Sequence, residues 1–247
     1  MLSEDKKNRI KELENRSQSR GIFVFSDFLS PSSLSDATDL LKNGEYSVFG
    51  GADFAERKMI RFGNQRELGY DEPFPITILK VTLQGGKFAS PITHRDVLGA
   101  VTGLGIERQK LGDMFVNGNF AYVIADQTVA KLILSDLSSI GRNSVKVEVI
   151  DTLPDCLAPT TESVRFSVAS NRVDSIICKV FNLSRDDGKG LFQKELVLIN
   201  GKTVENPSRA LKENETVAVR GYGKFIFIKE GGLSKKNKPY VEIELFV

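Results

Sequence analysis

Basic side chains recur in the last third of the chain, and they are the groups there best suited to binding chemistry. Arginine and lysine hold phosphate through charge-assisted hydrogen bonds. From Thr161 onward there are 15 Lys and Arg against 11 Asp and Glu, a net charge of +4, whereas residues 1–160 have 19 against 21, a net charge of −2. This modest asymmetry indicates a polyanionic ligand only together with a motif. The cations expected on two short helices in this part are Arg172, Lys179, Arg185, Lys189 and Lys194.

A catalytic site is not evident. His94 is the only histidine, and it stands in the segment Thr93–Asp96 at the start of a predicted helix. Histidine can act as a general base because its charge changes near neutral pH. However, no nucleophile or metal-ligand cluster accompanies it in a recognisable motif, and Thr93 and Asp96 are better explained as helix-start groups. We therefore expect neither catalysis nor a small-molecule substrate.

Composition excludes several classes of protein. The 40% apolar and 27% charged residues are ordinary for a soluble globular chain. No apolar run approaches the roughly 18–20 residues of a membrane helix, and the N-terminus lacks the apolar region of a secretory signal. Cys156 and Cys178 have no spacing typical of a disulfide framework or zinc site. We expect a cytoplasmic protein without membrane, metal or cofactor.

The elements that position these residues predict an α+β chain of three small units. Residues 1–74 indicate an N-terminal α/β domain, in which Ser30 caps a helix that begins at Pro31. Residues 75–153 give the order β-α-β-β-α-β, typical of RRM-like and ferredoxin-like domains. In that unit Thr93 and Asp126 cap the helices.

The third predicted domain spans residues 162–247 and follows a linker, residues 151–161. It contains a strand, two short helices and then further strands. Ser184 is placed to cap the second helix. Two tight helices against a small twisted sheet would direct their polar face outward.

The middle unit lacks the aromatic consensus of an RNA-binding RRM. Its central strands offer Phe115, Phe120 and Tyr122 without a Lys/Arg-Gly-Phe-type motif. Core packing is the favoured interpretation of these rings, and base stacking remains the alternative.

The order of motifs resembles a known family. Arg172-Val173-Asp174, Leu183-Ser184-Arg185, residues 197–202 and residues 217–224 resemble the S4 domain of ribosomal protein S4 relatives. The Arg-Gly-Tyr-Gly-Lys ending is similar to the YlmH family of cell-division-associated RNA-binding proteins. Upstream blocks extend the resemblance over nearly the whole chain, and they are Asp27-Phe28-Leu29, residues 49–51, 55–58, 93–100, 103–106 and 110–113.

The resemblance implies a non-enzymatic protein that grips structured RNA. S4 domains of this kind bind folded rRNA or tRNA. YlmH-like proteins are associated with the ribosomal large subunit carrying peptidyl-tRNA, in ribosome-associated quality control. Two alternatives stay open. One is an RNA-modifying enzyme, because S4 domains are often appended to such enzymes, and the other is a protein scaffold in cell division.

A basic helix pair recognises the shape of folded RNA rather than its sequence. On this basis Arg172, Arg185 and Lys189 are predicted to contact phosphates directly. The alternative for Arg172 is an ion pair with Asp174 or Asp186. The other predicted RNA-binding residues are Lys179, Ser184, Lys194, Lys202, Arg220 and Lys224.

Two further surfaces are expected to be secondary. His94 and Arg95 could form a second RNA surface, and the cluster Lys235, Lys236 and Lys238 could steer RNA or be a solvated loop.

The second S4 helix departs from the family pattern. It has Gly188 and Gly190 at interior positions, where each glycine should cost about 0.8–1 kcal/mol relative to alanine. The usual glycine after this helix is replaced by Glu195. We therefore expect a looser and less cationic grip on RNA.

Overall fold

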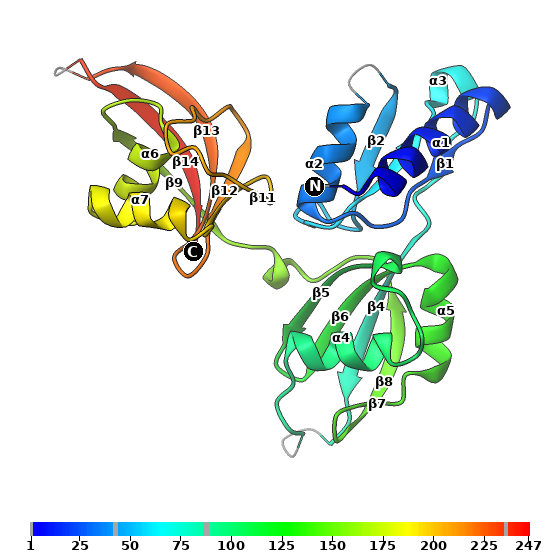
Figure 1. Cartoon of the computed structure of the whole chain (residues 1–247). Coiled ribbons are helices and arrows are strands. Elements are labelled where there is room, and N and C mark those ends of the chain that lie inside the picture. Colours follow the sequence, from blue (N-terminus) through cyan, green and yellow to red (C-terminus); the bar gives the residue numbers. More distant parts are fainter. Residues whose placement is uncertain (1, 42–43, 86–88, 235–236) are drawn as a thin grey trace. The chain divides into compact units, whose positions relative to one another are not determined.

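The computed structural model describes residues 2–41, 44–85, 89–234 and 237–247. The chain divides into two compact units, Met1–Ala158 (unit 1) and Pro159–Val247 (unit 2). Both combine helices with antiparallel sheets (Figure 1), so the predicted α+β class is confirmed. The two predicted domains 1–74 and 75–153 both fall in unit 1, and their separation into independent domains stays a prediction.

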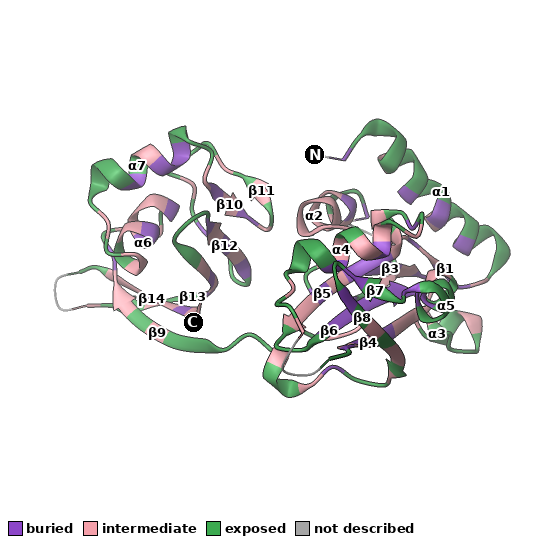
Figure 2. Ribbon diagram, turned by 90° about the horizontal axis from the view of Figure 1, so that it is seen from below, coloured by how far each residue is buried: buried purple, intermediate pink, exposed green. Residues whose placement is uncertain are grey.

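The first part of unit 1 packs helices on a three-stranded sheet of order β1-β3-β2. Its helix α1 is highly charged but buries Ile10 and Leu13 one turn apart, which gives the narrow buried stripe visible in Figure 2. Ser30 caps α2 as predicted, its side chain accepting from the N–H of Ser33 at 3.3 Å. The elements are α1 (Glu4–Arg20), β1 (Val24–Phe25), α2 (Pro31–Leu40), β2 (Tyr46–Phe49), β3 (Met59–Phe62) and α3 (Gln65–Leu68).

The second part of unit 1 has the predicted β-α-β-β-α-β order on a sheet of order β5-β6-β4-β8-β7. Thr93 and Asp96 form a capping box on α4, and Asp126 caps α5. The elements are β4 (Ile76–Leu83), α4 (His94–Thr102), the 3-10 turn η2 (Arg108–Lys110), β5 (Leu111–Asn117), β6 (Phe120–Asp126), α5 (Gln127–Asp136), β7 (Ser139–Ile140) and β8 (Asn143–Ile150).

The two faces of this sheet are covered differently. Helices α4 and α5 pack on the face that carries Leu79, Val81 and Val123. On the other face, Tyr122 and Ile124 join one buried cluster with Phe28 and Met59 from the first part of unit 1. Part of the face that an RRM uses for stacking is therefore occupied by the chain itself.

The three aromatic rings of the middle strands divide accordingly. Tyr122 is buried, and Phe115 packs edge-on against Phe54 with ring centroids 5.6 Å apart. Core packing is confirmed for these two rings. Phe120 is 37% exposed, with the Lys80 ammonium 4.9 Å from its ring centroid, so the preference for core packing does not hold there.

The predicted linker is partly wrong. Leu153 is buried, and both Leu153 and Leu157 pack in the cluster around Phe28 and Met59. A short 3-10 turn, η3 (Asp155–Leu157), continues this contact. Pro154 and Pro159 suggested an unstructured connection. Leu153, which precedes the first proline, and Leu157, which lies between the two, instead pack against unit 1. Unit 2 begins only at Pro159.

Unit 2 is a six-stranded antiparallel sheet with two helices packed on one face (Figure 1). Its strand order is β11-β10-β12-β13-β14-β9. The core contains Val173, Ile176 and Ile177 of α6 and Leu191 and Phe192 of α7. The elements are β9 (Thr161–Ser167), α6 (Val173–Val180), α7 (Arg185–Gln193), β10 (Val197–Ile199), β11 (Lys202–Thr203), β12 (Glu215–Val219), β13 (Gly223–Leu233) and β14 (Pro239–Phe246).

Candidate nucleic-acid interface

The two helices of unit 2 approach each other closely at one glycine. Gly188 is buried in α7, and a Cβ added there would meet the Cys178 sulfur of α6 nearer than real Cβ atoms come to any neighbour. A glycine at this position therefore allows the helices to touch, and the expected looser grip on RNA stays a prediction. Gly190 differs, since an added Cβ would meet nothing within 4 Å.

The start of α7 is fixed by its predicted cap. The Ser184 hydroxyl accepts from the N–H of Asp187 at 3.1 Å and donates to the Asp187 carboxylate at 2.6 Å. This arrangement satisfies a backbone donor at the helix N-terminus. It also engages one of the two acids that follow Arg185. Ser184 thus has a structural role in orienting the first turn of α7.

Arg185 and Lys189 lie one helical turn apart on α7, so they share one face of that helix. Both side chains are exposed. Within the described part of the chain, neither has a carboxylate at ion-pair distance. Two adjacent cations of this kind can each receive a phosphate oxygen without first breaking an internal pair.

Arg172, at the N-cap of α6, is paired instead. Its Nε and Nη2 donate to the two carboxylate oxygens of Asp174 at 3.0 and 2.7 Å. This hydrogen bond and the charge of Asp174 raise the pKa of the Arg172 guanidinium. The alternative of an ion pair with Asp174 is therefore what the structure contains. The pair is at the surface, where solvent screening leaves ion pairs weak, so it can still exchange for a phosphate.

A tight turn between β12 and β13 lies beside the helix pair. The Arg220 N–H donates to the Leu196 carbonyl at 3.0 Å, which brings Arg220 next to the segment that follows Lys194. Tyr222 is 49% exposed and packs on Phe181 at the end of α6, with ring centroids 6.0 Å apart. The sequence reasoning assigned no role to Tyr222, although a tyrosine between two glycines in a basic turn is a usable signal for an exposed ring.

The other predicted cations are less concentrated. Lys179 is exposed on α6, and Lys202 lies in the edge strand β11. Lys224 is half-buried, with its ammonium 4.2 Å from the centroid of the Phe246 ring. Lys238 is exposed, whereas Lys235 and Lys236 lie outside the described residues.

Helix α7 ends in a Schellman motif built around Glu195. The N–H of Leu196 donates to the Leu191 carbonyl, and the N–H of Glu195 donates to the Phe192 carbonyl, both at 3.0 Å. Glu195 adopts φ 55°, the left-handed region in which glycine is preferred. The missing family glycine thus leaves a strained backbone but an intact helix end.

His94 and Arg95 belong to unit 1. Both are exposed in the first turn of α4. Arg95 lines a shallow hollow together with Asp96 and Asp136, so acids accompany it. Their use as a second RNA surface stays a prediction.

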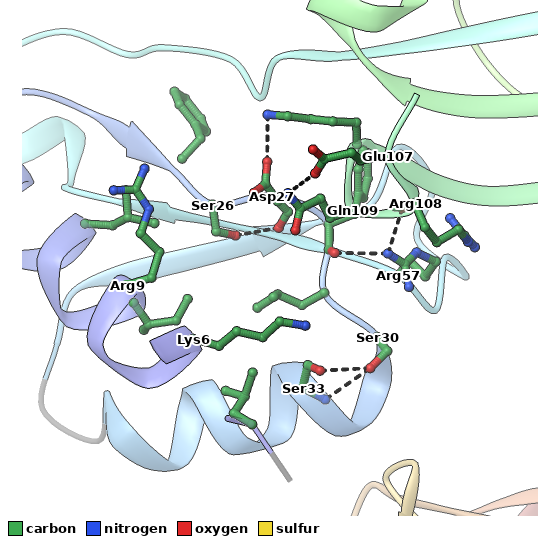
Figure 3. Close-up of a pocket in the computed structure, with 17 residues that line it drawn as sticks. Lys6, Arg9, Ser26, Asp27, Ser30, Ser33, Arg57, Glu107, Arg108 and Gln109 are labelled. Atoms are coloured by element: carbon green, nitrogen blue, oxygen red, sulfur yellow. Dashed lines mark hydrogen bonds and ion pairs between the residues drawn. The ribbon is translucent and has the colours of Figure 1, made fainter. Parts of the chain in front are cut away.

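Unit 1 contains a larger cavity of about 560 Å³ (Figure 3). The Asp27 carboxylate in it is 2.7 Å from the Lys110 ammonium. Burial acts to lower the pKa of Lys110, but the hydrogen bond and charge of Asp27, followed by those of Asp126, outweigh burial and raise it. The Asp27 side chain is 38% exposed, whereas Asp126, which lies 3.5 Å from the same ammonium, is buried and does not line the cavity.

Neither a metal-ligand cluster nor a membrane-spanning helix occurs in residues 2–41, 44–85, 89–234 and 237–247. These residues contain no group of three or more His, Cys, Asp or Glu side chains arranged to hold a metal ion. Among the same residues, no helix combines the length and apolar character needed to cross a membrane.

Residues 70–153 match the family model described as "Putative RNA-binding domain in YlmH". The solved structure of cell division protein ylmH from Streptococcus pneumoniae shares the fold at a TM-score of 0.50 and 17% identity, over 61% of this chain and 93% of that one.

A curated relative is the ribosome-associated protein quality control protein P2 of Bacillus subtilis (strain 168). It is 31% identical over 224 residues, which make up 89% of this chain and 86% of the relative. Similarity at this level runs through both units, and the YlmH-specific match lies within unit 1. The chain therefore belongs to the YlmH family.

Proposed function

We propose that this protein binds structured RNA of the ribosome through the helix pair of unit 2, as an S4-type, non-enzymatic factor in ribosome-associated quality control. The proposed ligands are rRNA and tRNA on the large subunit, in the cytoplasm. The match of residues 70–153 to a YlmH RNA-binding model and the name of the Bacillus subtilis relative support RNA and the ribosome as partners.

The observation that carries the proposal is the pair Arg185 and Lys189. They are exposed on one face of α7, and the described residues offer them no acid partner. The Ser184 cap and the Gly188 contact fix the helix that presents them. Because the helix backbone is already fixed, it loses little freedom on binding, which favours a rigid, shape-specific RNA.

Neighbouring groups extend this surface in the proposal. Lys179, Lys194 and Arg220 would add phosphate contacts, and Arg172 would contribute after release from Asp174. Tyr222 would stack on an unpaired base, because an exposed ring beside a cation suits single-stranded segments of folded RNA. Lys202 and Lys224 would contribute at the margin.

The test is sedimentation of the full chain with ribosomal large subunits. We expect Arg185→Ala to reduce the bound fraction and to weaken its dependence on salt. Arg165→Ala is the matched control, because Arg165 is an exposed arginine of unit 2 on β9 that pairs with Glu242. Equal binding by wild type and Arg185→Ala, with no response to salt, would exclude the helix pair as the site. A pull-down before and after RNase treatment separates RNA binding from a protein scaffold. Partners held through RNA are lost after the treatment, whereas partners held by protein contacts remain.

A further inference from the structure

The cavity in unit 1 is lined by more cations than acids. It lies between α1, the start of α2 and the η2 turn (Figure 3). The cationic lining consists of Lys6, Arg9, Arg57, Arg108 and Lys110, and the acidic lining consists of Asp27 and Glu107.

Within the described residues, ion pairs engage two of these five cations. The Lys110 ammonium pairs with the Asp27 carboxylate. The Arg9 guanidinium is 2.9 Å from the carboxylate of Glu12, a residue outside the cavity lining. Lys6 has no ion-pair partner among the described residues. Figure 3 shows its side chain extending from α1 toward Ser30 at the start of α2.

The two half-buried guanidiniums donate to backbone carbonyls. Arg57 donates to the carbonyls of Phe28 at 3.0 Å and Leu111 at 2.9 Å, while Arg108 donates to the same Leu111 carbonyl at 2.7 Å. Burial and then the like charge of Arg108 lower the pKa of Arg57 to about 10, although Asp113 acts in the opposite direction. A bound anion would relieve this repulsion.

The remaining lining fits a nucleotide. Ser30 and Ser33 lie at the N-terminus of α2, where the Ser30 hydroxyl accepts from the Ser33 N–H at 3.3 Å and donates to the Ser33 hydroxyl at 3.1 Å. The helix dipole favours an anion at this end, and the first turn carries no acid that would repel one. An apolar wall of the cavity includes Ile10, Leu13 and Phe28. A volume of about 560 Å³ is sufficient for a small ligand of this kind.

We propose that this cavity binds a nucleoside phosphate, with the phosphate between Lys6 and the first turn of α2 and the nucleoside against the apolar wall. The ligand is either a free nucleotide or a nucleotide of an RNA chain. The site is separate from the helix pair of unit 2 and does not depend on the function proposed for it.

The experiment titrates the full-length protein with AMP, followed by the amide signals of Ser32 and Ser33. Removing the Lys6 charge in Lys6→Gln should weaken AMP binding about tenfold, the value of one charged hydrogen bond. Lys11→Gln is the matched control, because Lys11 is an exposed lysine of α1 outside the cavity lining and should bind AMP like wild type.

The Ser33→Asp variant distinguishes loss of AMP binding from loss of folding. A carboxylate in the first turn of α2 should stabilise the helix while repelling a phosphate. We expect an unchanged or higher melting temperature and loss of AMP binding. No AMP-dependent shift in wild type, full AMP binding by Ser33→Asp, or equal weakening by Lys6→Gln and Lys11→Gln would overturn the proposal.

A competition experiment identifies the source of the phosphate. Displacement of AMP by hexauridylate lacking a terminal phosphate indicates a nucleotide of an RNA chain, and its failure to displace AMP indicates a free nucleotide. Arg185→Ala should leave AMP binding intact in either case. If Arg185→Ala binds ribosomes like wild type while AMP binding still requires Lys6, the function proposed for unit 2 is excluded. The proposal of a nucleotide site in unit 1 is then still supported.

Discussion

Replacing Gly188 by alanine tests whether the close contact between α6 and α7 requires a glycine at this position. The added methyl group would collide with the Cys178 sulfur, whereas the same change at Gly190 enters open space. Both positions are inside α7. The pair therefore compares one chemical change in two environments of the same helix.

The magnitudes follow from two opposing effects. Alanine in place of an interior glycine gains about 0.8–1 kcal/mol of helix stability. Overpacking a close contact costs about 1–3 kcal/mol. Gly190→Ala should therefore raise the free energy of unfolding of unit 2 by about 0.8–1 kcal/mol, and Gly188→Ala should lie about 1–3 kcal/mol below it.

The assay is urea unfolding of the full chain. Because the sequence has no tryptophan, the methyl signals of the buried residues Ile176 and Ile177 should report unit 2. Adding Cys178→Ala to Gly188→Ala removes the colliding sulfur and should recover stability, with a coupling energy of about 1–3 kcal/mol. Equal stability of Gly188→Ala and Gly190→Ala, or no coupling to Cys178, would refute the reasoning.

Three further predictions concern unit 2. Glu195→Gly should raise the free energy of unfolding by about 1 kcal/mol in urea titration, because glycine relieves the left-handed φ of 55°, and a loss would contradict this. Ser184→Ala should lower the unfolding free energy by about 0.5–2 kcal/mol in the same assay through loss of the α7 cap, and an unchanged midpoint would show that the cap is dispensable. Alkylation followed by mass spectrometry at pH 8 should label the exposed Cys156 before Cys178, because burial and then Asp174 raise the pKa of the Cys178 thiol. Faster labelling of Cys178 would be inconsistent with that environment.

Local chemistry was predictable from the sequence. Ser30, Thr93, Asp126 and Ser184 all cap helices where their spacing indicated. A cap depends on a side chain and backbone donors within three residues, so the sequence contains everything needed to infer it. The β-α-β-β-α-β order was predictable for the same reason, since strand and helix periodicities are local.

Long-range packing was not predictable from the sequence. The contact between Gly188 and Cys178 joins two helices, and a glycine seen alone indicates only flexibility. Likewise, Phe28 covers a sheet whose strands lie far from it in sequence. The Arg172 pair with Asp174 was foreseen only as an alternative, because neighbouring charges do not decide rotamers. The cavity around Lys6 had no sequence signature, because its lining residues come from segments that lie far apart in the chain.

The most direct test of RNA binding by the helix pair is the salt dependence of affinity for large-subunit rRNA. Each lost phosphate contact should reduce the slope of log K against log salt by about 0.7–0.9. The double variant Arg185→Ala, Lys189→Ala should therefore bind more weakly, with a slope lower by about 1.4–1.8. The charge-matched control is Arg165→Ala, Lys229→Ala, since both residues pair with Glu242 on the sheet, and it should retain the wild-type slope. Identical slopes for the two double variants would contradict the account.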